Sequence, residues 1–144
     1  MPSIRLSDEE MRYITLFESI TGATAKDCII DSDANRIIFV VKKGDMGMAI
    51  GKNGTNVKRA TKLIGKPVEL VEAGDTPEEL IKNALFPAKV YATKIFKDTS
   101  GRLVAHVAVD PKDKGLAIGK DGLKIRKARM LAKRYFDIDN VIIK

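Results

Sequence analysis

Two short stretches of the chain combine glycine and lysine in a way that suits contact with a phosphate group. The first is Gly51-Lys52-Asn53-Gly54 and the second is Gly119-Lys120-Asp121-Gly122, and a basic segment follows each. Glycine accepts positive φ and lets another backbone approach closely. Free amides at the start of a helix favour an anion. The residue types therefore predict two tight turns that each hold a phosphate beside a lysine.

Both turns belong to a longer internal repeat. Residues 47–60 align with residues 115–128 at a spacing of 68 positions, and seven of the fourteen aligned pairs are identical. A repeat at a fixed period indicates one structural unit that is used twice. We therefore expect two domains, at residues 1–73 and 74–144. The connection between them is too short for freely tumbling domains.

Positive charge is concentrated around the two turns. Residues 42–66 contain seven basic residues and one acid, and residues 112–134 contain nine basic residues and two acids. The chain as a whole has a net charge of +7, so the rest of it is net acidic. One basic helix is often no more than a solvated face, but two at equivalent repeat positions favour a polyanionic partner.

Other chemistries fit the sequence poorly. A nucleotide-binding P-loop needs four residues between its glycines and a hydroxyl after the lysine. Here only three residues separate Gly47 from Gly51, and Asn53 follows Lys52. With one histidine, one cysteine, no nucleophile–base pair and no metal-ligand cluster, the chain suggests no catalytic residues, no metal and no cofactor. We expect a protein that is not an enzyme.

The sequence also lacks the signals of a membrane or secreted protein. No segment reaches the ~18 apolar residues that cross a bilayer, and residues 1–20 carry charges in place of a signal peptide's apolar core. The lone Cys28 lies in an apolar run and is expected to be a small buried residue. We expect a cytoplasmic protein with no membrane partner.

Local patterns predict the same element order in both halves. In the first half a capping box at Ser7 begins a helix to about residue 21. Strands follow at 28–31 and 36–41, then a short helix before Gly51, a longer helix to about residue 64 and a strand at 67–71. In the second half the helix from 77 to about 86 is followed by strands at 89–97 and 102–109, a helix to about 136 and a strand at 140–144. The predicted class is α+β.

The pattern Ile-Gly-x-x-Gly between two helices, with a basic second helix, resembles the KH family of RNA-binding domains. The helix and strand at the front of each unit resemble the type II arrangement, and two such units cover nearly the whole chain. The resemblance implies a three-stranded sheet in each unit with helices on one face. It also implies that each Gly-x-x-Gly turn clamps about four single-stranded nucleotides.

The wider pattern, including Asp27-Cys-Ile-Ile-Asp and the segments from Gly44 and Asp110 into the two turns, resembles the archaeal NusA family. This resemblance implies a transcription factor that binds nascent RNA and acts on termination, elongation or antitermination. Single-stranded RNA is the implied partner. RNA polymerase and other transcription factors stay open as further partners, because the polymerase-contacting and S1 domains of the bacterial relatives find no room in this chain. A general RNA chaperone or ribosome-assembly protein is the alternative.

The resemblance assigns RNA contact to the turns, to the apolar residue before each turn and to the basic residues that follow. The expected RNA-binding residues are Ile50, Gly51, Lys52, Asn53, Gly54, Lys58, Arg59, Lys62, Ile118, Gly119, Lys120, Asp121, Gly122, Lys124, Arg126 and Lys127. Val57 and Ile125 are candidates for the groove floor or for the core. Asp121 places a carboxylate inside the second turn, which either weakens that clamp or serves the turn itself.

Overall fold

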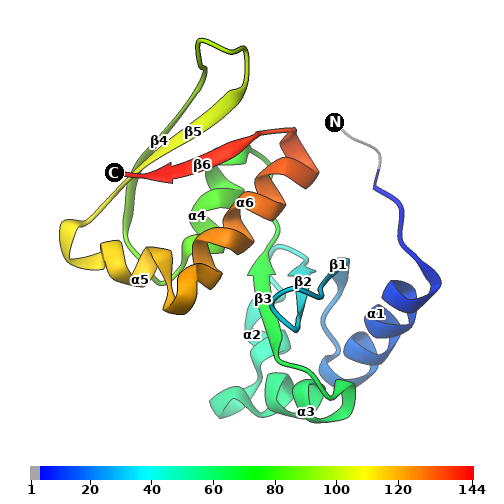
Figure 1. Cartoon of the computed structure of the whole chain (residues 1–144). Helices are drawn as coiled ribbons and strands as arrows, with labels where there is room; N and C mark the ends of the chain where they lie inside the picture. The colour runs from blue at the N-terminus through cyan, green and yellow to red at the C-terminus, as the bar shows by residue number, and fades with distance from the viewer. Residues whose placement is uncertain (1–3) are drawn as a thin grey trace. The chain divides into compact units, whose positions relative to one another are not determined.

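The structure is a computed structural model that describes residues 4–144. Contacts divide the described residues into two compact units, Arg5–Ala73 and Gly74–Lys144, with Ile4 assigned to the second (Figure 1). Both units follow the order helix, strand, strand, short helix, tight turn, helix, strand. The α+β class and the three-stranded sheet expected in each unit are confirmed.

The first unit forms a mixed sheet in the order β1-β2-β3. Strand β1 runs antiparallel to β2, and β3 runs parallel to β2. Its elements are α1 (Asp8–Thr21), β1 (Ala25–Asp31), β2 (Arg36–Val41), α2 (Met46–Ile50), a 3-10 turn η1 (Lys52–Gly54), α3 (Thr55–Ile64) and β3 (Val68–Glu72).

The second unit repeats this topology with the sheet order β4-β5-β6. Strand β4 is antiparallel and β6 parallel to the central β5. Its elements are α4 (Pro77–Leu85), β4 (Val90–Lys97), β5 (Leu103–Val109), η2 (Pro111–Asp113), α5 (Lys114–Ile118), η3 (Lys120–Gly122), α6 (Leu123–Phe136) and β6 (Asn140–Ile143).

Helix starts lie where the capping patterns predict them. The Ser7 hydroxyl accepts the Glu10 N–H at 3.1 Å, and the Glu10 carboxylate accepts the Ser7 N–H at 2.7 Å. This reciprocal pair satisfies two amides that have no partner inside α1. At the other end Gly22 adopts φ 77° and closes the helix. In the second unit the Thr76 hydroxyl accepts the Glu79 N–H, and Pro77 occupies the first helical position.

Strand β1 begins three residues earlier than the sequence suggests. The residues Ala25, Lys26 and Asp27 are not strand formers by composition. They pair with the end of β2, where Ala25 lies opposite Val41, and an irregularity in register separates Ala25 from Asp27. Pairing with an existing strand therefore extends β1 beyond its β-prone run.

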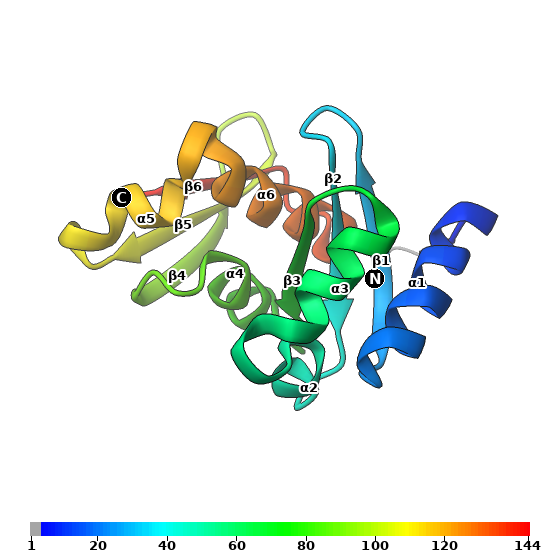
Figure 2. The same cartoon turned by 90° about the horizontal axis from the view of Figure 1, so that it is seen from below.

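The helices of the first unit pack on one face of its sheet, as expected (Figure 2). The rings of Phe17 in α1 and Phe39 in β2 stack with their centroids 4.3 Å apart. Ala49 of α2 and Ala60 of α3 are fully buried in the same cluster. Cys28 is a buried free cysteine at this core, which agrees with its expected role as a small packing residue.

The second unit builds its core from the same positions. In β5 the buried residues Ala105, Val107 and Val109 alternate with the more exposed His106 and Ala108. Because side chains alternate between the faces of a strand, one face of this sheet is packed and the other is open, except at Val104, which is 7% exposed. Buried residues of α4 and α6 complete the core: Leu80, Ile81, Ala84, Leu85, Ala128, Leu131 and Ala132.

A buried ion-pair network distinguishes the first sheet. The Arg36 side chain is 1% exposed and donates to Asp31 Oδ2 at 3.0 Å and to Glu69 Oε2 at 2.7 Å. Arg36 begins β2, Asp31 ends β1 and Glu69 lies in β3, so one guanidinium joins all three strands. Removing one partner of a buried ion pair leaves a charge in a medium that solvates it poorly.

We predict that Arg36→Met destabilises the protein by about 3 kcal/mol, because Asp31 would remain buried without its ion pair to Arg36. Urea unfolding followed by circular dichroism measures the change.

The matched variant is Lys133→Met, which removes an exposed ion pair with Asp137 and Asp139. Exposed pairs contribute little because water already solvates both charges, so its unfolding midpoint should stay close to that of the parent. An equal loss in both variants would contradict the assignment of the Arg36 network as a stabilising feature.

Candidate nucleic-acid interface

The first turn joins α2 to α3 through four residues, three of which have unusual backbone conformations. Gly51 has φ 76° and ψ 170°, a combination that is essentially limited to glycine. Asn53 has φ 57° and Gly54 has φ 75°, both left-handed. This run turns the chain sharply, so that α3 starts directly beside the end of α2.

The second turn, between α5 and α6, has the same geometry. Gly119 has φ 80° and ψ 169°, Asp121 has φ 55° and Gly122 has φ 72°. Each angle lies within a few degrees of its counterpart in the first turn. The sequence repeat therefore corresponds to a repeat of backbone conformation, and both turns are built to present the same amides.

Close packing also requires the first glycine of each turn. A Cβ on Gly51 would lie 2.7 Å from Cγ of Asn56 and 2.9 Å from its backbone nitrogen. A Cβ on Gly119 would lie 2.7 Å from Cβ of Lys124 and 2.9 Å from its nitrogen. The first turn of α3 or α6 thus lies directly against the glycine.

The left-handed conformation at the third turn position accounts for the residue types found there. Asn53 and Asp121 occupy the same conformation, and asparagine and aspartate are the residues other than glycine that adopt it most readily. Both side chains are exposed. Asp121 therefore fits the turn for backbone reasons, and its exposed carboxylate can influence a bound anion.

Side-chain contacts that sequence spacing does not reveal support both turns. The Asn56 side-chain amide donates to the Met48 carbonyl at 2.8 Å, which ties α3 back to α2. In the second unit the repeat counterpart of Asn56 is Lys124, whose Nζ donates to the Phe86 carbonyl at 3.1 Å. The second turn is therefore tethered to the end of α4.

The residue whose carbonyl accepts this bond is aromatic. Phe86 is the C-cap residue of α4 and is 73% exposed, the largest exposed fraction among the large apolar side chains of the described residues. The C-cap residue of α1 in the first unit is Gly22, which has no side chain to offer. No sequence pattern marks Phe86, because its importance depends on the contact with Lys124.

The apolar residues before each turn are open to solvent. Ile50 is 40% exposed and Ile118 is 44% exposed, at the ends of α2 and α5. Val57 is half-buried, whereas Ile125 is 6% exposed and belongs to the core of its unit. Both isoleucines can thus offer an apolar surface beside the turn, and Ile125 cannot.

The basic residues predicted to bind RNA differ in how exposed their side chains are. Lys52, Lys58, Arg59, Lys62 and Lys120 are exposed, and Lys124 and Arg126 are half-buried. Lys127 is only 5% exposed. So little exposed surface leaves Lys127 poorly placed to reach a ligand, unlike the other predicted bases.

Hydrogen bonds fix the approach to the second turn. Asp110 Oδ2 accepts the Tyr91 hydroxyl at 2.7 Å, and Oδ1 accepts the Lys112 N–H at 3.1 Å. The bond from Tyr91 lowers the pKa of Asp110 below its usual value, and the same bond raises the pKa of Tyr91. Asp110 is therefore ionised at neutral pH, where it caps η2 and holds the segment that leads into α5.

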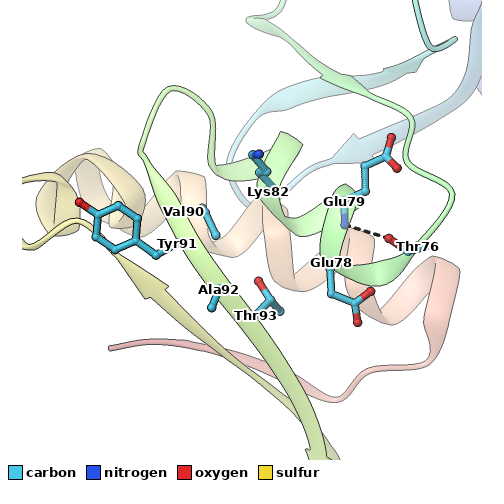
Figure 3. Close-up of a pocket in the computed structure, with 8 residues that line it drawn as sticks. All are labelled: Thr76, Glu78, Glu79, Lys82, Val90, Tyr91, Ala92 and Thr93. Carbon is cyan, nitrogen blue, oxygen red and sulfur yellow. Dashed lines mark hydrogen bonds between the residues drawn. The ribbon is translucent and has the colours of Figure 1, made fainter.

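A hollow of about 380 Å³ lies between α4 and the edge strand β4 (Figure 3). Tyr91 stands at one end of it and Thr76 at the other, and Glu78 and Glu79 contribute carboxylates. With two acids and Lys82 as its only base, this hollow does not suit a polyanion. The described residues contain no group of three or more potential metal ligands. None of their helices is long and apolar enough to span a membrane.

Comparison with protein families matches both halves of the chain to KH domains. A model described as KH domain matches residues 11–98, and a model described as NusA-like second KH domain matches residues 77–144.

Known proteins match along nearly the whole chain. The probable transcription termination protein NusA of Halococcus morrhuae is 46% identical over 138 residues, which are 96% of each chain. That of Methanocaldococcus jannaschii is 33% identical over 144 residues, covering 98% of this chain and 75% of the relative. A solved structure described as the crystal structure of APE1850 is 37% identical, with a TM-score of 0.87 over 96% of this chain and all of that one.

The geometry of the first turn predicts that one added methyl group at Gly51 strongly destabilises the protein. Gly51→Ala should destabilise the protein by about 2 kcal/mol or more, because alanine is strained at φ 76° and ψ 170° and its Cβ meets Asn56. Urea unfolding gives the value.

Gly47→Ala is the control in the same segment. Gly47 lies inside α2, and a Cβ added there would meet no other atom within 4 Å. Alanine there should stabilise the protein by about 0.5–1 kcal/mol, since glycine is unfavourable in a helix interior. If Gly51→Ala were as well tolerated as Gly47→Ala, the tight packing described for the turn would be incorrect.

Proposed function

Since the chain belongs to the NusA family of proteins with two KH domains, we propose that it binds single-stranded RNA and acts on transcription termination, elongation or antitermination through nascent RNA. We take residues 1–73 and 74–144 as its two RNA-binding domains. Its role is to hold RNA and not to catalyse a reaction, and it works in the cytoplasm beside the transcribed strand.

The observation that carries the proposal is the duplicated Gly-x-x-Gly turn with one backbone conformation. Two turns with matching φ and ψ values present the same amides, and each adds an exposed lysine, Lys52 or Lys120. A phosphate near these amides is favoured by their dipoles and by the lysine charge. Two such sites on one chain suit a polymer that repeats its phosphate at regular intervals.

The proposed contacts combine charge with apolar surface. At the first turn the exposed bases Lys58, Arg59 and Lys62 of α3 extend the positive surface, and Ile50 offers an apolar contact. At the second turn Lys124 and Arg126 follow in α6, and Ile118 takes the role of Ile50. In this proposal phosphates lie along the turn and bases lie against the isoleucines.

The two sites are not equivalent in the proposal. The second turn carries Asp121, whose exposed carboxylate repels a nearby phosphate. It also has Phe86 tethered beside it, and an exposed ring can stack on a nucleobase. The first turn thus holds phosphate more strongly, and the second gains from contact with the base.

We predict that Lys52→Asp combined with Asn53→Asp weakens binding of single-stranded RNA at least tenfold, about 1.4 kcal/mol. The change puts two carboxylates against the phosphate path, while both glycines still form the turn. Fluorescence anisotropy with a labelled RNA measures the affinity, and the melting temperature should change little because both side chains are exposed.

The matched control is Arg12→Glu combined with Asn35→Asp. It makes the same change in net charge, and Asn35 is also a left-handed asparagine, but it lies in the β1–β2 turn at the opposite end of β2 from the clamp. Affinity should stay within twofold of the parent. Lys120→Asp should cost less than Lys52→Asp, because Asp121 already weakens the second site. Equal losses in the control and the turn variant would mean that RNA responds only to net charge.

We further predict a steep salt dependence. If about five phosphates are neutralised, the logarithm of the binding constant should fall against the logarithm of salt concentration with a slope of about −3 to −4, at roughly −0.7 per contact. Anisotropy titrations at a series of KCl concentrations give the slope. A flat dependence, or equal affinity for duplex DNA and single-stranded RNA, would overturn the proposed mode of binding.

Cross-linking in cells separates this role from that of a general RNA chaperone. Nascent transcripts should dominate the RNA bound to a transcription factor of this kind. Recovery of mature ribosomal RNA in their place would favour the chaperone or ribosome-assembly alternative.

A further inference from the structure

The open face of the second sheet has features that neither turn explains. A hollow of about 270 Å³ lies on it, lined by Ala92, Lys94 and Phe96 of β4, His106 and Ala108 of β5, and Lys144. Register places Lys94 directly opposite His106, and His106 opposite Ile142 of β6. All three strands of the sheet therefore contribute to one surface.

The aromatic part of this surface is held in place. The rings of Phe96 and His106 meet edge to face with their centroids 4.4 Å apart. Phe96 nevertheless remains 40% exposed, and Ile142 is 37% exposed. A ring fixed by a neighbour loses little entropy when a planar ligand stacks on it.

The charge of the surface has one sign. Lys94 and Lys144 line the hollow, and no aspartate or glutamate occurs in β4, β5 or β6. A fixed aromatic ring, an apolar floor and flanking lysines are the combination that binds single-stranded nucleic acid through base stacking and backbone phosphates. An acidic protein segment would satisfy the lysines but would leave the ring without a planar partner.

The corresponding face of the first sheet cannot serve in this way. Glu69 on this face is half-buried and pairs with Arg36. The other residues of the face are buried: Asp27, Ile29, Asp31, Arg36, Ile38, Val40 and Val71. Ile38 is the repeat counterpart of His106 and has no exposed surface. Only the second unit therefore offers such a face to a ligand.

We propose that the open face of the β4-β5-β6 sheet is an additional contact for single-stranded RNA, with a nucleobase on Phe96 and phosphates on Lys94 and Lys144. It rests on the proposed function, because it takes RNA already held by the turns as its ligand. In this proposal an RNA longer than the two turns hold also contacts this face, so long RNAs should gain affinity that short ones do not.

The test uses the full chain and two labelled single-stranded RNAs of mixed sequence. One has about eight nucleotides, enough for two clamps of about four, and the other has about sixteen. The variant Lys94→Glu with Phe96→Leu keeps apolar volume in the sheet but removes the charge and the ring. Its affinity for the long RNA should fall at least fivefold, and its affinity for the short RNA should stay within twofold of the parent.

Two matched variants sharpen the comparison. Lys97→Glu makes the same charge change in the same strand outside the hollow and should leave both affinities within twofold of the parent. Lys94→Glu with Phe96→Tyr restores a ring and should recover part of the loss.

Unchanged affinity of the Lys94→Glu, Phe96→Leu variant for the long RNA overturns this proposal, and cross-linking of Phe96 to a protein would then assign the face to a protein partner. An equal loss of affinity for both RNAs also overturns it, because the open face would then not be binding the additional nucleotides of the long RNA. Failure of the Lys52→Asp, Asn53→Asp variant to weaken the short RNA would instead count against the proposed function itself.

Discussion

The rest of the site depends on the first glycine of each turn, where the structure leaves no room for a Cβ atom. At Gly51 and at Gly119 the next helix begins so close that a Cβ would overlap its backbone. Because no side chain intervenes, two helices can meet almost end to end at each turn. The exposed lysines and isoleucines are placed by that junction.

Steric constraints fix the backbone of both turns, and the two turns then differ in the charge of their side chains. The two turns have the same backbone, yet one contains Asn53 and the other Asp121, so the turns differ in charge without any difference in shape. Phe86 adds a second difference, since Lys124 at the second turn donates to the backbone carbonyl of this exposed aromatic residue. Duplication has thus produced two sites with a common geometry and separate chemistry.

Much of the fold could be predicted from sequence because local signals agree with it. Ser7 and Glu10 start α1, Gly22 ends it, and the β-prone run at 36–41 is the central strand. The features that were missed depend on tertiary contacts. Ala25 joins β1 only because Val41 lies opposite it, and Lys127 is buried although the other predicted bases of α6 are more exposed. Asn56 and Phe86 likewise matter through partners that sequence spacing does not reveal.

The ion pairs of Arg36 have a consequence for heat resistance. Burying charges costs solvation free energy, but that cost falls as temperature rises, because the hydration of ions is entropically unfavourable. The attraction of Arg36 to Asp31 and Glu69 is offset less at high temperature than at low. The ion pairs of Arg36, which join three strands, therefore contribute relatively more to stability at high temperature. In that range the free energy gained by burying apolar surface levels off.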